Sequence, residues 1–546
     1  MGTEKIKSFI ADNRWILIAS AFFIIWKFFL ITLLWHDRIA PPSPDDSYMY
    51  ILHINSTAEC PSLIFCKDAL FSLQKYSGFE HLTYRLFFGG IARLFDLDPI
   101  TTYQISFFIG TVIMLMAIIL LATSLSKNKK LVAFSILILS LFNGAGSYHG
   151  FFFVVPSFFA LLFFFIIISV ILKDSRHWKI MLPILIPLSI MSHMLGFYLV
   201  MMLPIFFVIL IFISKKIDYA ILKKVFFCTL IALIFHFGLS TYLQYTSWSN
   251  PYGVESMLKE IIAKNKTSAD LNIQGTRNNS EKPSHNNNPT IFNVQLASLD
   301  KIDSQYSKWI FFNWIGFVIF IFFLIINIVY KQYKLISLYL SSLILTLMGS
   351  ISPYGERLLL IVWPLTFLLY AYGMWFSYAF FNQWAKDNFL KIILKIIYIT
   401  GILAFILINI IYSYSWNSYL NKADDVNLKK DFIYYLEQDS QNAKLISYFT
   451  ASNNITNFIL LNFNTIKFKS QDDINSADYY LLEKKDISSA SINDNIVLQR
   501  LSGANNKISS ETIPPIKTID VTKKLENFTL IKTIGSVEIY KNKNIN

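Results

Sequence analysis

The sequence is poor in cysteine and in charged residues. Only 3 of the 546 residues are cysteines, and 15% are Asp, Glu, Lys or Arg. Cys60 and Cys66 share one hydrophilic segment, where they form either a short disulfide or two free thiols. No further Cys or His ligands lie near them, so they do not complete a tetrahedral metal site. Cys228 lies within an apolar run, which predicts a small core residue.

Several common motifs are also missing. A short basic segment precedes the apolar run 15–35, and no small-residue cleavage site follows it. This pattern predicts a retained signal anchor with a cytoplasmic N-terminus. The polar segment 417–546 contains no glycine-rich phosphate loop and no dense His/Cys/Asp/Glu cluster, so it is assigned no chemistry. We find no internal sequence repeat.

Apolar residues are abundant. They make up 54% of the chain, with 50 Phe and 29 Tyr. A globule of this size and composition would be insoluble, so the sequence predicts an α-helical polytopic membrane protein embedded in a lipid bilayer. The net charge of +13 comes largely from short Lys and Arg clusters between apolar runs. That distribution is typical of cytoplasmic loops and argues against a nucleic-acid partner.

Hydropathy and basic flanks predict about 11 transmembrane helices. Three apolar stretches are too long for one helix and are interrupted by polar breaks, so each is interpreted as two helices joined by an outer turn. The half that covers residues 131–142 is short for a full span. The predicted apolar stretches are 15–35, 103–125, 131–172, 180–214, 225–245, 309–330, 335–381 and 392–416.

One alternating assignment then places every basic cluster on the cytoplasmic side. The opposite side receives the first long loop, 36–102, with interfacial helices, and the Asn-rich flexible loop, 246–308. It also receives the three polar breaks at 143–150, 192–196 and 349–357. The result is a transmembrane catalytic domain, 1–416, in the plasma (inner) membrane.

The remaining segment, 417–546, is predicted to be a small soluble extracytoplasmic α/β domain. Its apolar patches alternate with polar residues in the manner of short strands, and a glycine at 535 indicates a hairpin. The predicted elements are a helix at 431–438 and strands at 443–449, 457–461, 479–483, 528–534 and 536–540.

Two adjacent carboxylates, Asp45 and Asp46, follow three prolines just beyond the first span. The prolines hold the approach extended. Mutual repulsion and partial desolvation would raise the pKa of at least one carboxyl toward the range of a general base. The alternative is a capping role for a helix that begins at Ser47. We interpret the pair as the catalytic centre.

Other candidate residues occur on the same predicted face. Residues 79–98 show a helical period, with Leu82, Leu86, Ile91 and Leu94 on one side. His81 and Arg85 are four residues apart and can share one face, either at the site or by snorkelling to the interface. His149 and His193 lie at polar breaks; for His193 a packed structural role is the alternative.

The late break contains Tyr354, Glu356 and Arg357. The Arg357 guanidinium at an apolar helix entrance suits bidentate binding of a lipid phosphate, and an ion pair with a neighbouring acidic group is the alternative.

Together these features resemble the polyprenyl-phosphate-sugar-dependent integral membrane glycosyltransferases of the C-type (GT-C) fold. The resemblance rests on the outer loop that opens with Asp45-Asp46 and ends at 97–99, on the element 352–360 followed by Pro364, on about 11 spans and on an outer C-terminal domain. No subfamily is identified. The group includes protein mannosyltransferases, aminoarabinose transferases of lipid A and oligosaccharyltransferases.

The resemblance implies a sugar transfer from a polyprenyl-phosphate-linked donor to a hydroxyl of a glycan, lipid or protein, with inversion. Asp45 or Asp46 would be the base, and Arg357, with His193 or Arg85, would stabilise the leaving phosphate. Some members use a divalent metal, but the extended Asp-x-Asp form is absent here, so no metal or other cofactor is predicted. The alternatives are a transporter or flippase for lipid-linked sugars and an enzyme of the O-antigen polymerase or ligase type.

Overall fold

The computed structural model describes the helical part of the chain and one C-terminal sheet. The residues that it describes are 3–35, 47–58, 81–142, 144–145, 148–149, 151, 154–173, 176–245, 314–349, 359–384, 388–421, 446–449, 479–483, 528–534 and 537–543. The following predicted features lie outside them: Asp45, Asp46, Cys60, Cys66, Tyr354, Glu356, Arg357, the loop 246–308, the helix 431–438 and the strand 457–461.

Every apolar segment predicted from the sequence is helical in the described part of the chain. Six of these helices, α1, α4, α8, α9, α14 and α15, are long and apolar enough to cross a membrane by length and composition. The chain is therefore a multi-pass membrane protein; which shorter helices also span stays a prediction. The helices are α1 (Thr3–Trp35), α4 (Pro99–Leu125), α5 (Lys129–Ser140), α6 (Pro156–Leu172), α7 (Trp178–Ser192), α8 (Leu195–Ser214), α9 (Tyr219–Tyr245), α12 (Trp314–Val329), α13 (Tyr333–Gly349), α14 (Leu359–Trp384) and α15 (Asn388–Asn421).

Two of the three long apolar stretches divide at their predicted polar breaks. Between α5 and α6 lies a small antiparallel pair, β1 (Gly144–Ala145) and β2 (Tyr148–His149), in which Gly144 is opposite His149. Between α7 and α8 the chain turns at His193. The third break lies outside the described residues for most of its length. Helix α5 has only 12 residues and is about 18 Å long, as its short apolar segment indicated.

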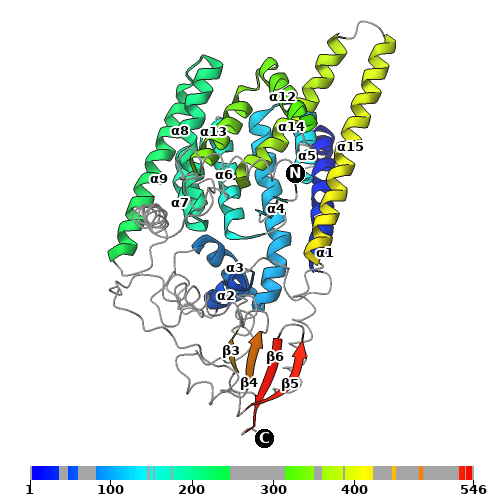
Figure 1. Cartoon of the computed structure of the whole chain (residues 1–546). Coiled ribbons are helices and arrows are strands. Elements are labelled where there is room, and N and C mark those ends of the chain that lie inside the picture. The colour runs from blue at the N-terminus through cyan, green and yellow to red at the C-terminus, as the bar shows by residue number, and fades with distance from the viewer. Residues whose placement is uncertain are drawn as a thin grey trace, which may run out of the picture.

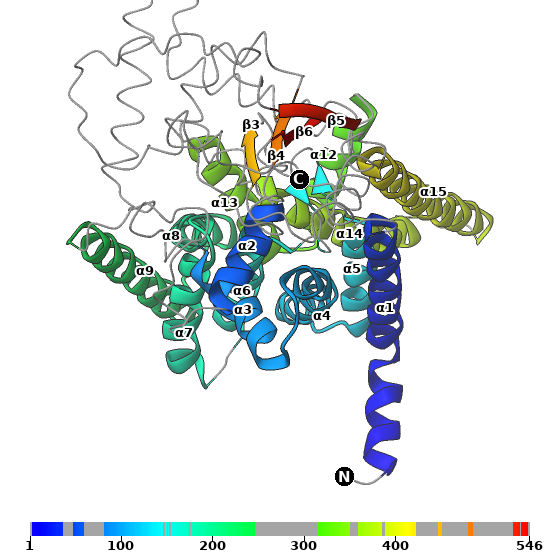
Figure 2. The ribbon, with the colours of Figure 1, turned by 90° about the horizontal axis from the view of Figure 1, so that it is seen from below.

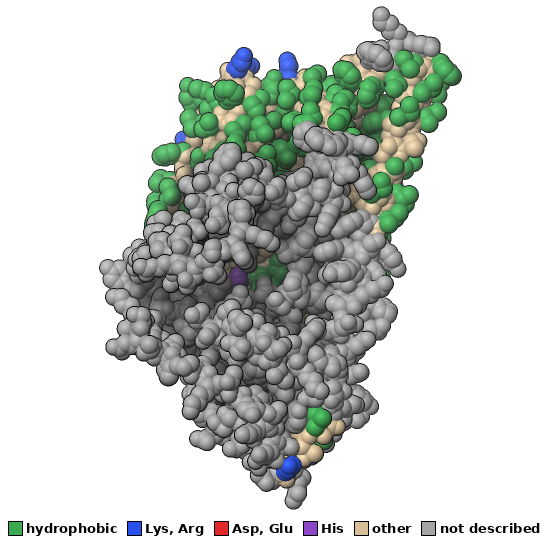
Figure 3. All heavy atoms as spheres, viewed as in Figure 1, with side chains coloured by type: hydrophobic (Ala, Val, Ile, Leu, Met, Phe, Trp, Pro, Cys, Tyr) green, Lys and Arg blue, Asp and Glu red, His purple; other side chains and the backbone are tan. Residues whose placement is uncertain are grey.

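Helix α6 is buried on nearly all sides, and α4, α7 and α8 pack against it (Figure 2). At the periphery, α15 turns Ile and Leu side chains outward, and only 6% of its apolar 18-residue stretch is buried inside the protein. Such a helix suits contact with lipid. In Figure 3, hydrophobic side chains cover the helical half of the visible face, and Lys or Arg side chains lie at its upper edge. This is the arrangement expected of a bilayer-embedded bundle.

Two lysines inside the bundle stabilise the C-terminal ends of other helices. Lys27 of α1 is fully buried, and its Nζ donates to the carbonyl of Phe142 just after α5, at 2.5 Å. Lys224 of α9 is 4% exposed. Its Nζ donates to the carbonyls of Val170 and Ile171 at 3.2 Å and of Lys173 at 2.5 Å. The last carbonyls of a helix lack intrahelical hydrogen-bond donors, and these ammonium groups donate to them instead.

Replacement of Lys224 by Met is expected to lower the free energy of unfolding by about 1–3 kcal/mol. The reason is that buried carbonyls of the last turn of α6 lose a charged donor. Thermal unfolding of the purified protein in detergent, followed by near-ultraviolet circular dichroism, measures the effect. The control is Lys223→Met, because Lys223 is the neighbouring residue and is exposed; equal midpoints for the two variants would contradict a capping role.

The C-terminal strands form one mixed sheet in the order β3–β4–β6–β5. β3 and β4 pair in parallel, whereas β6 pairs antiparallel with both β4 and β5. The predicted hairpin is confirmed by the pairing of β5 with β6. In Figure 1 the sheet lies at the same end of the bundle as α2 and α3. The strands are β3 (Ile446–Phe449), β4 (Tyr479–Glu483), β5 (Phe528–Ile534) and β6 (Val537–Asn542).

Two shorter helices lie at this end of the bundle, close to the start of α4 (Figure 1). α2 covers Ser47–Ala58 and α3 covers Leu82–Phe95. Asp98 ends the segment after α3 and caps α4, since its Oδ1 accepts from the backbone N–H groups of Ile100 and Thr101 at 3.0 and 2.9 Å. The two helices within the first long loop are thus fixed against the bundle.

Candidate functional site

Helix α3 buries one face that carries both apolar and polar side chains. Arg85 is only 3% exposed, whereas Leu94 is 81% exposed. Of the predicted apolar side, Leu82 is buried against the protein and Leu94 is exposed, and the alternative that Arg85 snorkels to the interface is wrong. The face that packs against the bundle consists of Leu82, Thr83, Tyr84, Arg85, Phe88, Gly89 and Ala92.

A close crossing of α2 and α3 explains this orientation. At Gly89 a Cβ atom would lie 2.5 Å from Cβ of Thr57, so only glycine allows the two helices to approach this far. Thr57 donates from Oγ1 to the carbonyl of His53 at 2.8 Å. The same Oγ1 accepts from Nε of Arg85 at 3.4 Å. The crossing therefore holds the Arg85 guanidinium against α2.

Three histidines from separate elements meet beside this crossing. The His81 and His193 rings stack with centroids 5.5 Å apart and an interplanar angle of 4°. The His53 ring lies 6.2 Å from that of His81. All three side chains are buried. His53 belongs to α2, His81 precedes α3, and His193 lies between α7 and α8, so the site joins the first long loop to the bundle.

His193 is held by the start of α8. Its Nδ1 accepts from the backbone N–H of Leu195 at 3.0 Å. Its carbonyl accepts from the backbone N–H of Gly196 at 2.8 Å. A neutral imidazole with Nδ1 as acceptor carries its proton on Nε2, so His193 can present a donor. At Gly196 a Cβ would lie 2.2 Å from the carbonyl oxygen of Ser189. Helix α8 therefore begins in direct contact with α7, which fixes this turn.

His81 has a backbone conformation that side chains rarely adopt. Its φ is 59°, in the left-handed region, and such residues concentrate at functional sites. Tyr50 of α2 packs edge-on against its ring at 6.1 Å and lies 5.6 Å from the Tyr84 ring. Thr83 donates from Oγ1 to the carbonyl of Leu188 at 2.9 Å, which ties the start of α3 to α7. Burial raises the pKa of Tyr84, so its hydroxyl stays neutral.

This histidine–arginine cluster, made of His53, His81, Arg85 and His193, offers hydrogen-bond donors and positive charge in a buried setting. Those are the properties that bind a phosphate. The cluster does not fit a metal ion: the nearly parallel stacked rings direct their nitrogen lone pairs within separate planes. No group of three His, Cys, Asp or Glu side chains in the described ranges could hold one.

The structure brings together three of the residues that the sequence singled out, namely His81, Arg85 and His193. It adds His53, which sequence reasoning missed. The available signal was the spacing of Tyr50, His53 and Thr57, which places them on one face of the helix predicted from Ser47. His149 lies in β2, paired with Gly144. The acidic pair and the late-break residues lie outside the described residues.

Comparison by sequence finds no matching family model and no matching curated protein. Comparison by structure finds the oligosaccharyltransferase of Archaeoglobus fulgidus. Its complex with zinc and sulfate aligns with a TM-score of 0.51 and 11% identity, over 95% of this chain and 73% of that chain. Its form tethered to an acceptor peptide aligns with a TM-score of 0.48 and 11% identity, over 91% and 72%. At this identity the likeness shows the fold alone: the chain has the C-type fold of a membrane oligosaccharyltransferase, as the resemblance implied.

Proposed function

We propose that this chain is a membrane glycosyltransferase that moves a sugar from a polyprenyl-phosphate donor to an acceptor hydroxyl on a glycan, lipid or protein. The observation that carries the proposal is the gathering of His53, His81, Arg85 and His193 at one buried site. Helix α2, which supplies His53, begins at Ser47, and Ser47 directly follows Asp46 in the chain. The pair of carboxylates therefore directly precedes, in the sequence, the helix that supplies His53 to the cluster.

In the proposed reaction Asp45 or Asp46 takes the proton of the acceptor hydroxyl, or orients that hydroxyl. The acceptor oxygen bonds to the anomeric carbon while the bond from that carbon to the phosphate oxygen breaks. The polyprenyl phosphate leaves with the bonding electrons. Arg85 and Nε2–H of His193 stabilise the added negative charge, because donors in a water-poor site act strongly on developing charge. A single displacement inverts the anomeric configuration.

Tyr354, Glu356 and Arg357 complete the proposed phosphate site. Arg357 would bind the phosphate bidentately. The oligosaccharyltransferase that shares the fold was crystallised with zinc and sulfate. For this chain we propose no metal, because the histidine–arginine cluster does not fit one and the acidic pair lacks the extended Asp-x-Asp form.

We further propose that the protein resides in the plasma (inner) membrane with this site on the extracytoplasmic face. The support is that α2, α3 and the C-terminal sheet lie at one end of the bundle (Figure 1), and the sequence predicts that the first loop and the C-terminal segment share one face. The polar groups of the cluster gather at that end, as expected of an enzyme whose site lies at the membrane surface.

The test is transfer from a radiolabelled polyprenyl-phosphate sugar by the full chain in liposomes. We expect label on the acceptor together with released polyprenyl phosphate. Arg85→Gln is expected to lower transfer roughly ten- to a hundredfold, since a hydrogen bond to a charged group contributes about 1.5–3 kcal/mol.

The matched control is Arg93→Gln, because Arg93 lies on the same helix and is exposed. Thermal unfolding of both variants separates a chemical effect from a folding effect. Movement of intact donor across the bilayer without cleavage of the sugar–phosphate bond would show that the chain is a flippase and not a glycosyltransferase.

A further inference from the structure

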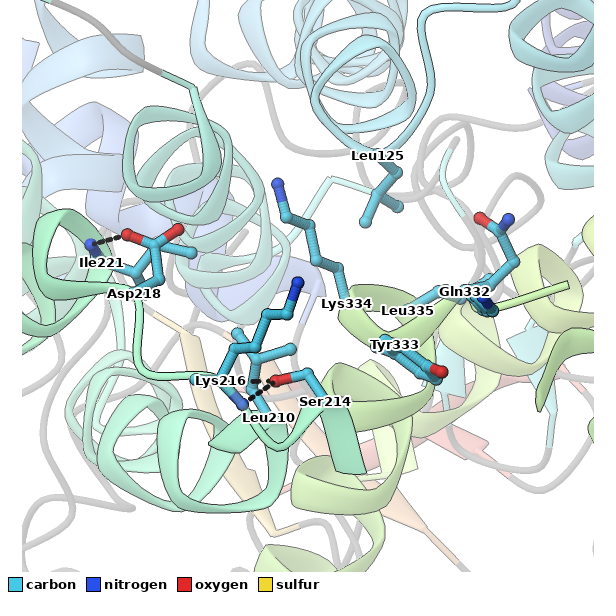
Figure 4. Close-up of a pocket in the computed structure, with 11 residues that line it drawn as sticks. Leu125, Leu210, Ser214, Lys216, Asp218, Ile221, Gln332, Tyr333, Lys334 and Leu335 are labelled. Carbon is cyan, nitrogen blue, oxygen red and sulfur yellow. Dashed lines mark hydrogen bonds between the residues drawn. The ribbon is translucent and has the colours of Figure 1, made fainter. Parts of the chain in front are cut away.

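A second basic site occurs at the other end of the helical bundle. A pocket of about 350 Å³ lies between the turn that joins α8 to α9, the turn that joins α12 to α13, and the end of α4. In Figure 4 the side chains of Lys216 and Lys334 extend into the space between Asp218 and Leu125. Lys331 also lines the pocket. Two ammonium groups therefore extend into one cavity, and a third lysine lines it.

The pocket and the histidine–arginine cluster lie at opposite membrane surfaces. α4 starts beside α3 and ends at Leu125 in the pocket wall. Its 27 residues span about 40 Å at 1.5 Å per residue. That length exceeds the hydrocarbon core of a bilayer, about 30 Å. The pocket therefore cannot belong to the site proposed for sugar transfer, and the sequence places it on the cytoplasmic side.

The positive charge of the pocket is not neutralised by its one carboxylate. Asp218 caps α9, where its Oδ1 accepts from the backbone N–H groups of Ala220 and Ile221 at 3.0 and 3.2 Å. No ion pair joins Asp218 to Lys216, Lys331 or Lys334 in the part of the chain that the structure describes. Counting three ammonium groups and one carboxylate, the pocket carries a formal charge of +2. An anion is the complementary ligand.

The turn between α12 and α13 retains a lysine where glycine is the usual residue. Lys331 has φ 57°, and its N–H donates to the carbonyl of Ile328 at 2.9 Å. The N–H of Gln332 donates to the carbonyl of Asn327 at 2.9 Å. This pair of bonds is a Schellman motif, in which the left-handed position favours glycine. A side chain at this position strains the backbone, which suggests a role for the ammonium group.

Part of the remaining wall is apolar, and Ser214, Gln332 and Tyr333 add polar groups to it. Leu125, Leu210, Ile221 and Leu335 line the pocket beside the lysines. A soluble phosphate needs only the charged part of such a site, whereas a phospholipid headgroup also brings its glycerol and the first acyl carbons. We propose that this pocket binds the phosphate of an anionic phospholipid headgroup, held by Lys216, Lys331 and Lys334 at the membrane surface opposite the histidine–arginine cluster.

The experiment uses the full chain in nanodiscs of phosphatidylcholine with about 20% phosphatidylglycerol. Native mass spectrometry counts the phosphatidylglycerol molecules that stay bound. We expect the triple variant Lys216→Gln, Lys331→Gln, Lys334→Gln to retain at least several-fold less phosphatidylglycerol than the unchanged chain. The control triple variant replaces Lys127, Lys130 and Lys179 by Gln. These lysines are exposed. Lys127 follows α4, and Lys130 and Lys179 lie in the first turns of α5 and α7 at the same face, so the charge change is matched.

A second variant separates binding from folding. Lys331→Gly removes one ammonium group and places glycine at the left-handed position, so we expect unchanged or higher thermal stability with less bound phosphatidylglycerol. Equal retention by the pocket variant and the control variant would overturn the proposal. Displacement of the lipid by millimolar inorganic phosphate would also overturn it, because the ligand would then be a soluble phosphate. Neither result depends on sugar transfer.

Discussion

Asp45→Asn and Asp46→Asn are expected to have the largest effect on sugar transfer. The variant that removes the base should lose about 10²–10⁴-fold in rate, the usual contribution of a positioned general base. An amide cannot accept the proton of the acceptor hydroxyl, so the acceptor attacks as a weaker nucleophile. The other carboxylate is proposed to orient the hydroxyl, and its replacement should cost less. Rates from a radiolabelled polyprenyl-phosphate sugar under saturating donor measure both effects.

Asp96→Asn is the matched control. Asp96 belongs to the same loop, is exposed, and has a left-handed backbone that Asn also tolerates. We expect unchanged transfer by this variant. In the unchanged protein the rate should fall as the pH decreases, because a protonated carboxyl cannot act as a base. Full activity in both Asp45→Asn and Asp46→Asn would remove the acidic pair from the mechanism and leave the cluster as a binding site alone.

Hydropathy and basic flanks predicted the apolar helices because the bilayer imposes a length and an apolar composition on each of them. The short apolar segment 131–142 became the short helix α5, and the break at 192–196 became the turn that carries His193. The hairpin near residue 535 was also predictable, since its strands are local in sequence. These features depend on neighbours along the chain, which a sequence displays directly.

The candidate site was only partly predictable because its members are far apart in the chain. His81 and Arg85 share a helical face through their spacing, but the stacking of His81 on His193 joins residues separated by more than a hundred positions. The sequence of α3 is apolar on more than one side, so its period could not decide which face is buried. The close contact of Gly89 with Thr57 decides which face is buried, and a glycine in the sequence does not by itself predict such a contact.

Lys224 shows the same limit for charge. Its position next to Lys223 between two apolar runs predicted a cytoplasmic cluster, and the pattern says nothing further about either residue. In the structure one lysine is exposed and the other donates to three carbonyls at the end of α6. Adjacent residues on a helix point about 100° apart. One therefore faces outward while its neighbour enters the bundle.

Gly89→Ala is expected to disrupt the contact between α2 and α3 and to abolish most of the transfer activity. Its new Cβ would lie 2.5 and 2.6 Å from Cβ and Cγ2 of Thr57, so the helices must separate. Overpacking of this kind costs about 1–3 kcal/mol, more than the gain of about 1 kcal/mol from alanine in a helix. Thr57 also accepts a hydrogen bond from Nε of Arg85. A shift of about an ångström therefore displaces Arg85, which is proposed to bind the phosphate, and can cost a hundredfold in rate.

Gly90→Ala separates packing from helix propensity. Gly90 neighbours Gly89 on α3, and a Cβ there would meet no atom within 4 Å. We expect this variant to keep its activity and to gain stability, measured as a higher thermal midpoint. Thr57→Ser combined with Gly89→Ala removes Cγ2 but keeps the hydroxyl, so it should restore part of the lost transfer. If Gly89→Ala and Gly90→Ala behaved alike, the position of Arg85 would not depend on this crossing, and the loop helices would have to be held by another contact.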